Sequence, residues 1–391
     1  MILSVLKKSR IVHLCFAISF FTSGLIINIA QFILYTCLKP FNKRLYRKLG
    51  YYLCYTFYSQ IVFLADWWSK SNLTLHISKK DYEQCGKEHG LLIMNHTYET
   101  DWLLGWMFTE KIGVLGNCKA YAKRSIQYIP SLGWSWKFAE FVFLERSYDK
   151  DKEFIGKQIS EIMDYPDPTW LLLNAEGTRF TLAKHAASQK FAAEHGLPVL
   201  KHHLTPRTKG FIASLPSLKA KCPAIYDIQL VVKPDEKVSP TVLNFLLGRT
   251  INAYMHVRRI PMSSVPSDED GAAKFMHNLF KEKDDQVDSF LKTGRFLPES
   301  ETTGYMEPFK LKPSLAPLLN TICWGIITLT PMLYYLASLL LSGELLYFSA
   351  GMCIIGTFYA LMQKTIGMSK ISKASDYGSD SPSKRSPNKQ T

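Results

Sequence analysis

The 391-residue sequence predicts an α/β domain, with a mixed sheet flanked by helices, placed between apolar membrane segments. Long uncharged runs lie near both ends of the chain, at residues 11–38, 315–341 and 345–362. Between them, short apolar runs typical of buried strands alternate with amphipathic stretches typical of helices. This alternation favours a sheet covered by helices, with functional loops at the strand ends.

The first apolar run, residues 11–38, has no Asp, Glu, Lys or Arg. About 20 apolar residues suffice to cross a bilayer core. Because no small-residue cleavage site closes the run, we expect an uncleaved anchor within an N-terminal region of residues 1–70. Polar residues such as Asn28 and Gln31 interrupt the run, so a bent or re-entrant hairpin is the alternative.

The two later runs, 315–341 and 345–362, are separated only by Ser342-Gly343-Glu344. We therefore expect a transmembrane helical hairpin within residues 309–363, with a buried soluble hairpin as the alternative. Basic residues flank the first run on both sides and follow the last one, which places the middle of the chain in the cytosol. The Ser-, Lys- and Pro-rich tail, residues 364–391, is predicted to be disordered.

The formal net charge of +14 suits anionic lipid surfaces, phosphate-bearing substrates or nucleic acid. The apolar runs and the lack of a concentrated basic and aromatic motif argue against nucleic acid. The eight cysteines include no CxxC pair, so we expect reduced packing residues and no metal site. The chemistry of the chain is therefore expected at a lipid or phosphate-bearing substrate.

The region from residue 50 to 70 is rich in Tyr, Phe and Trp. Such side chains favour the headgroup layer of a bilayer, which predicts an interfacial helix; an amphipathic core helix is the alternative. Residues 71–308 form the globular region. Its predicted strands are Gly90–Met94, Trp170–Leu173 and Ile225–Val232, and its predicted helices are 98–108, 150–163 and 272–293.

The strongest chemical signal is Asn95-His96-Thr97-Tyr98-Glu99-Thr100-Asp101, at a strand-to-helix junction. If His96 precedes the helix, its ring can fold back and meet Asp101 about one turn in. A carboxylate on one ring nitrogen fixes the tautomer and leaves the other nitrogen as a general base for a hydroxyl. Taken alone, one His and one Asp are more often structural than catalytic.

The second signal is Glu176-Gly177-Thr178-Arg179, which follows a predicted strand. Gly177 allows a tight loop, Thr178 offers a hydroxyl, and Arg179 offers a planar fork of donors that matches phosphate. A solvated turn is the alternative. Two weaker blocks accompany it: Lys123 to Gly133, leading to Arg146, and Leu197 to Leu200, followed by Pro206 to Gly210.

In order and rough spacing, these four blocks resemble the motifs of the glycerolipid acyltransferases. The likeness is strongest to the 1-acylglycerol-3-phosphate acyltransferases of the animal branch, which have several membrane segments. It covers residues of about 60 to 215. The family's His-x4-Asp falls on His96 and Asp101, and its Glu-Gly-Thr-Arg falls on residues 176–179. Its fourth motif falls near Pro198. There, Lys201-His202-His203 departs from the apolar residues that are common in the family.

This resemblance implies acyl transfer from acyl-CoA to the sn-2 hydroxyl of 1-acyl-glycerol-3-phosphate (lysophosphatidic acid), with no cofactor or metal. His96 and Asp101 are the implied catalytic residues. The acceptor phosphate is expected at Glu176, Gly177, Thr178, Arg179, Arg146 and Lys123, and the acyl-CoA at Pro198, Arg207 and Lys209. The implied location is the endoplasmic reticulum membrane, with the Golgi as alternative. Another lysophospholipid acceptor, such as lysophosphatidylinositol or lysocardiolipin, and a non-catalytic membrane scaffold are the alternative functions.

Overall fold

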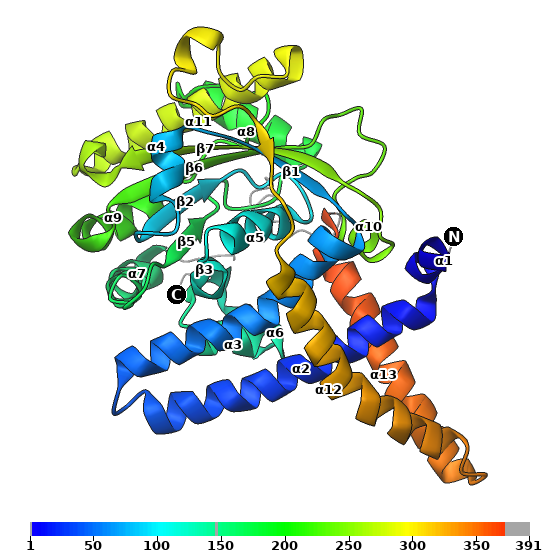
Figure 1. Cartoon of the computed structure of the whole chain (residues 1–391). Helices are drawn as coiled ribbons and strands as arrows, with labels where there is room; N and C mark the ends of the chain where they lie inside the picture. The colour runs from blue at the N-terminus through cyan, green and yellow to red at the C-terminus, as the bar shows by residue number, and fades with distance from the viewer. Residues whose placement is uncertain (1, 145–147, 372–391) are drawn as a thin grey trace, which may run out of the picture.

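The structure, a computed structural model, describes residues 2–144 and 148–371 (Figure 1). Its centre is an eight-stranded mixed sheet in the order β4-β3-β5-β2-β6-β7-β1-β8. The strands are β1 (Asn72–Ile77), β2 (Gly90–Met94), β3 (Cys118–Lys123), β4 (Val142–Leu144), β5 (Trp170–Leu173), β6 (Ala224–Val231), β7 (Asn252–Pro261) and β8 (Phe309–Lys310). The predicted α/β class, with a mixed sheet, is therefore confirmed.

Helices cover both faces of this sheet and extend from it on one side (Figure 1). The covering helices are α4 (Lys79–Gln84), α5 (Asp101–Lys111), α7 (Tyr148–Ile162), α8 (Leu182–Glu194), α9 (Lys209–Lys221), α10 (Val242–Leu246) and α11 (Glu269–Thr293). The remaining helices are α1 (Ile2–Lys8), α2 (Arg10–Ile33), α3 (Lys43–Phe63), α6 (Leu132–Phe138), α12 (Leu315–Leu340) and α13 (Leu345–Ser369).

Five neighbouring strands, β4, β3, β5, β2 and β6, run parallel to one another. The sheet becomes mixed at β7, which is antiparallel to β6, and at β8, which is antiparallel to β1. Because parallel strands end at the same edge of a sheet, the loops that leave β2, β3 and β5 meet there. The loops with the predicted functional residues follow these strands.

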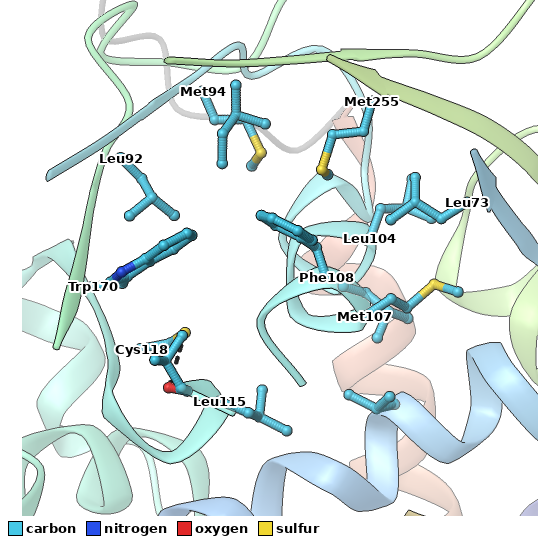
Figure 2. Close-up of a cluster of buried hydrophobic side chains, with 14 of the residues drawn as sticks. Leu73, Leu92, Met94, Leu104, Met107, Phe108, Leu115, Cys118, Trp170 and Met255 are labelled. Atoms are coloured by element: carbon cyan, nitrogen blue, oxygen red, sulfur yellow. Dashed lines mark hydrogen bonds between the residues drawn. The ribbon is translucent and has the colours of Figure 1, made fainter. Parts of the chain in front are cut away.

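Strand β2 alternates its side chains between two hydrophobic clusters. Leu91 and Ile93 belong to the cluster under α7, α9 and α11, whereas Leu92 and Met94 belong to the larger cluster under α5. Figure 2 shows Leu92, Met94 and Trp170 of the sheet facing Phe108 of α5. All five residues of β2 are buried, as expected for a central strand covered on both faces. This packing fixes the end of β2, where the candidate site begins.

Among the described residues, three helices are long and apolar enough to cross a membrane: Arg10–Leu38, Leu315–Leu340 and Leu345–Ser369. The first is α2 continued by a π-helical turn, Leu34–Leu38, and it has no break that would make it a re-entrant hairpin. α12 and α13 form the predicted hairpin, and most of their large apolar side chains are exposed in the protein alone. Such surfaces are expected to face lipid.

Two boundaries differ from the sequence prediction. α13 continues past Met362 to Ser369, so the first part of the expected tail is helical; residues 372–391 lie outside the described residues. The aromatic helix starts at Lys43, and its Phe57 and Tyr58 are fully buried in the larger cluster under α5. Only its outer side, with Tyr52 66% exposed, faces away from the protein. The alternative of an amphipathic core helix therefore describes α3 better than a helix lying only on the bilayer.

Candidate active site

The candidate site lies at the carboxyl edge of the parallel strands. Asn95 and His96 follow β2, and residues 174–179 follow β5. Lys123 is the last residue of β3 and is exposed. Crevices at this edge are the usual ligand sites of α/β sheets. The fold thus brings together segments that lie far apart in the sequence.

His96 and Asp101 form the predicted pair. The Nδ1 atom of His96 lies 2.7 Å from Oδ2 of Asp101, and the other carboxylate oxygen accepts the Trp102 amide at 2.7 Å. Asp101 is the first residue of α5 and not one turn inside it, so its charge lies at the positive end of the helix dipole. The Asp101 carboxyl is buried, whereas the His96 side chain is 19% exposed. The tautomer that fits donates from Nδ1 and leaves Nε2 as the acceptor on the accessible side.

The backbone of His96 is held on both sides by the loop after β5. Its amide donates to Oε1 of Glu176 at 2.7 Å, and its carbonyl accepts from the Phe180 amide at 2.9 Å. The second oxygen of Glu176 accepts from the Leu204 amide at 3.1 Å, and Glu176 is only 2% exposed. A carboxylate with both oxygens bonded to backbone amides is poorly suited to a phosphate of the same charge. These contacts let Glu176 hold the backbone of His96, and its predicted contact with the acceptor phosphate stays a prediction.

Asn95 extends β2 toward β6 by one further pair of hydrogen bonds. Its side-chain amide donates to the Leu230 carbonyl at 2.9 Å, and its Oδ1 accepts from the Leu230 amide at 2.8 Å. The same nitrogen contacts the Thr97 hydroxyl at 3.0 Å. Because Asn95 is 2% exposed, these bonds hold the start of the His96 loop in one position. The sequence places Asn95 beside His96 but gives no signal of its partner, which lies 135 residues away.

The turn at Gly177 brings polar side chains of the second motif to the same edge. Gly177 has φ of +72°, which favours glycine, and an added Cβ would lie 2.8 Å from Cδ of Arg207. The Thr178 hydroxyl accepts a 2.7 Å hydrogen bond from the buried Nζ of Lys184. Arg179 is half-buried, and its Nη1 donates to the Ser369 carbonyl at 2.6 Å. Lys184 has no distinguishing signal in the sequence, because a lysine in the first turn of a helix resembles a solvated residue.

The remaining predicted residues fall at different distances from this loop. Arg207 lies on it, since its amide donates to the Ala175 carbonyl at 2.7 Å. Lys209 begins α9 and is exposed. Pro198 lies in the loop after α8, which is held by hydrogen bonds from α8 to the Leu200 carbonyl. Arg146 lies outside the described residues. The segment from Leu204 to Arg207, rather than the one around Pro198, therefore contacts the candidate site.

The comparisons with known proteins identify the family of the chain. The Acyltransferase family matches residues 74–215, and the Acyltransferase C-terminus family matches residues 244–324. The human 1-acyl-sn-glycerol-3-phosphate acyltransferase gamma is 38% identical over 96% of this chain and 97% of its own length. The human delta form is 37% identical over 97% of this chain and 98% of its own. This chain belongs to the 1-acylglycerol-3-phosphate acyltransferase family.

The chain also matches a solved structure, that of the lysophosphatidic acid acyltransferase PlsC from Thermotoga maritima. The match has 14% sequence identity and a TM-score of 0.41, and it covers 72% of this chain and 98% of that one. For an acyltransferase of this family, the predicted fold class is confirmed together with the enzyme class. The roles of the individual site residues remain predictions, which the contacts above make specific.

Proposed function

We propose that the enzyme transfers a fatty acyl group from acyl-CoA to the sn-2 hydroxyl of 1-acyl-sn-glycerol-3-phosphate, which yields phosphatidic acid. The His96–Asp101 pair carries the proposal, because it presents a partly exposed ring beside the loop that carries Thr178 and Arg179. The names of the relatives that match nearly the whole chain support the choice of acceptor. The intact pair argues against the alternative of a non-catalytic scaffold.

In the proposed reaction, Nε2 of His96 takes the proton of the acceptor hydroxyl as its oxygen attacks the thioester carbonyl. Asp101 holds the ring and stabilises its charged form. The tetrahedral intermediate then breaks its C–S bond, and the CoA thiolate leaves with the proton held by His96. The new ester remains on the glycerol. These reaction steps balance in atoms and charge without a covalent acyl-enzyme, a cofactor or a metal.

The deciding assay is acyl transfer by the purified full-length enzyme with a panel of lysophospholipid acceptors. The proposal predicts the highest kcat/KM for lysophosphatidic acid. Higher values for lysophosphatidylinositol or lysocardiolipin would move the enzyme to the alternative acceptor class. No transfer to any acceptor from acyl-CoA would contradict the proposal, provided that the protein is folded.

We assign the acceptor phosphate to Arg179, helped by Lys123 on the same edge of the sheet. Replacing Arg179 by Lys keeps the charge but loses the two parallel hydrogen bonds of the guanidinium. We expect the KM for lysophosphatidic acid to rise roughly tenfold, with little change in the KM for acyl-CoA. The reverse pattern would move Arg179 to the donor site and leave Lys123 as the acceptor candidate.

We further propose that the enzyme is a multi-pass protein of the endoplasmic reticulum, with its catalytic region in the cytosol, where acyl-CoA is available. Two glycosylation sequons support this orientation, because their asparagines are used by the fold. Asn95 is buried between β2 and β6, and the Asn72 amide donates to Oδ1 of Asn252 at 2.8 Å. A glycan on either would break these contacts, which supports a location of this domain away from the glycosylation machinery.

An exposed sequon tests this orientation without disturbing the fold. Asp235 and Lys237 lie in an exposed loop after β6, and replacing them by Asn and Thr creates the sequon 235–237. We expect this variant to remain unglycosylated in cells and fully active. A glycan at position 235, detected as a mobility shift that an endoglycosidase removes, would place the catalytic region in the lumen.

A further inference from the structure

The end of the C-terminal hairpin lies against the candidate active site. α13 starts at the hairpin tip and returns to the catalytic domain, where it ends at Ser369 (Figure 1). The Ser369 carbonyl accepts the 2.6 Å hydrogen bond from Nη1 of Arg179. Two residues later, the Ile371 amide lies 3.4 Å from Oε1 of Glu99. Residues 369–371 therefore contact both loops that carry the predicted site residues.

The contact with Arg179 gives a hydrogen-bond donor to a backbone carbonyl at the end of α13. The last carbonyls of a helix lack intrahelical partners and carry a partial negative charge. The last turn of α13 has no basic residue of its own. Arg179 supplies a donor to one of these carbonyls and, with the C-cap residue Lys370, a cation at this end of the helix. Because a guanidinium has five N–H donors, one bond to a carbonyl leaves the fork able to bind a phosphate.

The end of α13 is fixed to the rest of the protein just before this contact. Met362 and Ile366 are buried in a cluster with Ala17 of α2 and Leu246 of α10. The Ser369 carbonyl is therefore held in place by packing on two other helices. An arginine side chain carries about 2 kcal/mol of rotamer entropy, so a fixed partner lowers the cost of ordering it when a ligand binds.

We propose that the last turn of α13 is a positioning element of the acceptor site, which holds Arg179 through the Ser369 carbonyl. The inference rests on the proposed role of Arg179 as the phosphate ligand. It gives the C-terminal hairpin a task beyond membrane attachment, since the acceptor site is incomplete without its end. Loss of this turn therefore weakens acceptor binding and leaves donor binding unchanged.

Two shortened chains separate this role from a general effect of truncation. A chain ending at Ile371 retains every described residue of the turn and serves as the control. A chain ending at Ile366 removes the Ser369 carbonyl but keeps Met362 and Ile366. Its last helix, Leu345–Ile366, still extends for about 33 Å, enough to cross a bilayer core. Both chains are assayed with lysophosphatidic acid and acyl-CoA, and their thermal unfolding is compared in detergent.

We expect the control to match the full-length enzyme. The chain ending at Ile366 should show a roughly tenfold higher KM for lysophosphatidic acid, about the worth of one hydrogen bond to a charged group. Its KM for acyl-CoA should be unchanged. In the Arg179→Gln background, the same truncation should add no further effect, because the residue to be positioned is gone.

A second variant keeps the chain at full length. Gly367→Pro breaks the helix before Ser369, because the proline ring lacks the backbone N–H and clashes with the carbonyl of Gln363, so the Ser369 carbonyl is displaced from Arg179. This variant should raise the KM for lysophosphatidic acid even if the chain ending at Ile366 fails to fold. An unchanged or lower acceptor KM in these variants overturns the inference, as does an equal effect in the Arg179→Gln background. A full-length enzyme that does not acylate lysophosphatidic acid would contradict the proposed function instead.

Discussion

Among the described residues, two His–Asp pairs join Nδ1 of the ring to a carboxylate with nearly the same geometry but in different surroundings. In the first, Nδ1 of His96 lies 2.7 Å from Asp101; in the second, Nδ1 of His203 lies 2.9 Å from Asp284. The side chain of His203 is only 1% exposed, and its Nε2 contacts Oε1 of Gln229 at 3.0 Å. In the part of the chain that the structure describes, Nε2 of His96 has no such partner. General-base chemistry requires an accessible ring nitrogen, which only the first pair offers.

The second pair holds a loop rather than a substrate. Asp284 of α11 also accepts the amides of Lys201 and His202, each at 2.7 Å. Burial alone would raise the pKa of Asp284, but the hydrogen bonds from His203 and from these two amides outweigh it and lower the pKa. The loop fixed in this way presents the Leu204 amide to Glu176, which in turn holds His96. The buried pair therefore supports the exposed one through the backbone.

Replacing each histidine by Ala should separate these roles most strongly. His96→Ala removes the proposed base and should lower kcat by about 10²–10⁴, the usual worth of general-base catalysis. The substitution also takes one partner from the buried Asp101, which keeps the Trp102 amide, so thermal unfolding should be measured in parallel to establish the folded fraction. Steady-state kinetics with lysophosphatidic acid measure the effect. Full activity of His96→Ala would refute the proposed mechanism.

His203→Ala is the matched control. The substitution removes the His203 hydrogen bond from each of the buried side chains of Asp284 and Gln229, so it should lower the free energy of unfolding by about 1–3 kcal/mol. The folded fraction should keep most of its kcat. If His203→Ala instead lost as much turnover as His96→Ala while its melting temperature stayed unchanged, the buried pair would belong to the chemistry.

Replacing Asp101 and Asp284 by Asn should show the same contrast between lost turnover and lost stability, with smaller effects. Asp101→Asn allows the wrong His96 tautomer and should lower kcat by roughly 10²-fold while the protein stays folded. Asp284→Asn replaces an acceptor of three donors, so it should lower the melting temperature more than the turnover. Paired kinetics and thermal unfolding of both variants measure this contrast. An Asp101→Asn enzyme with wild-type kcat would show that His96 does not depend on its carboxylate.

The sequence predicted the first pair but not the second, for a physical reason. His96 and Asp101 are five residues apart, so local geometry alone brings them together. His203 and Asp284 are 81 residues apart and meet only because the loop and α11 pack side by side. The same limit hid the contact between Arg179 and Ser369, which joins residues 190 positions apart. Patterns within one segment predict local chemistry, whereas contacts between segments depend on the complete fold.

The strands show the same limit. β2 and β5 are short uninterrupted apolar runs, and the sequence located both. β1 and β7 include the polar residues His76 and His256, which face each other in register, so their pattern did not stand out. β3 also escaped, because it is a mixed strand near the edge of the sheet. The predicted fold class nevertheless followed from the central strands, which determine where the site lies.

Another buried histidine, His256, gives a smaller effect that depends on pH. Burial lowers the pKa of His256 from 6.5 to about 4, with the nearby Asp227 opposing the shift. Its Nε2 lies 3.0 Å from the Tyr305 hydroxyl, so the neutral ring fits this site. The unfolded chain takes up the proton more readily than the folded one. Stability is therefore full above about pH 6.5 and falls as the pH decreases from there toward about 4.

Between pH 7.5 and pH 5, this linkage amounts to a loss of about 2 kcal/mol from His256. His256→Gln can keep a hydrogen bond to Tyr305 but cannot titrate, so its melting temperature should decrease less over this pH range. Thermal unfolding in detergent at the two pH values measures the difference. If the melting temperatures of His256→Gln and of the wild type decreased equally between the two pH values, another group would control the acid sensitivity. The distinction between buried and accessible histidines would then apply to catalysis alone.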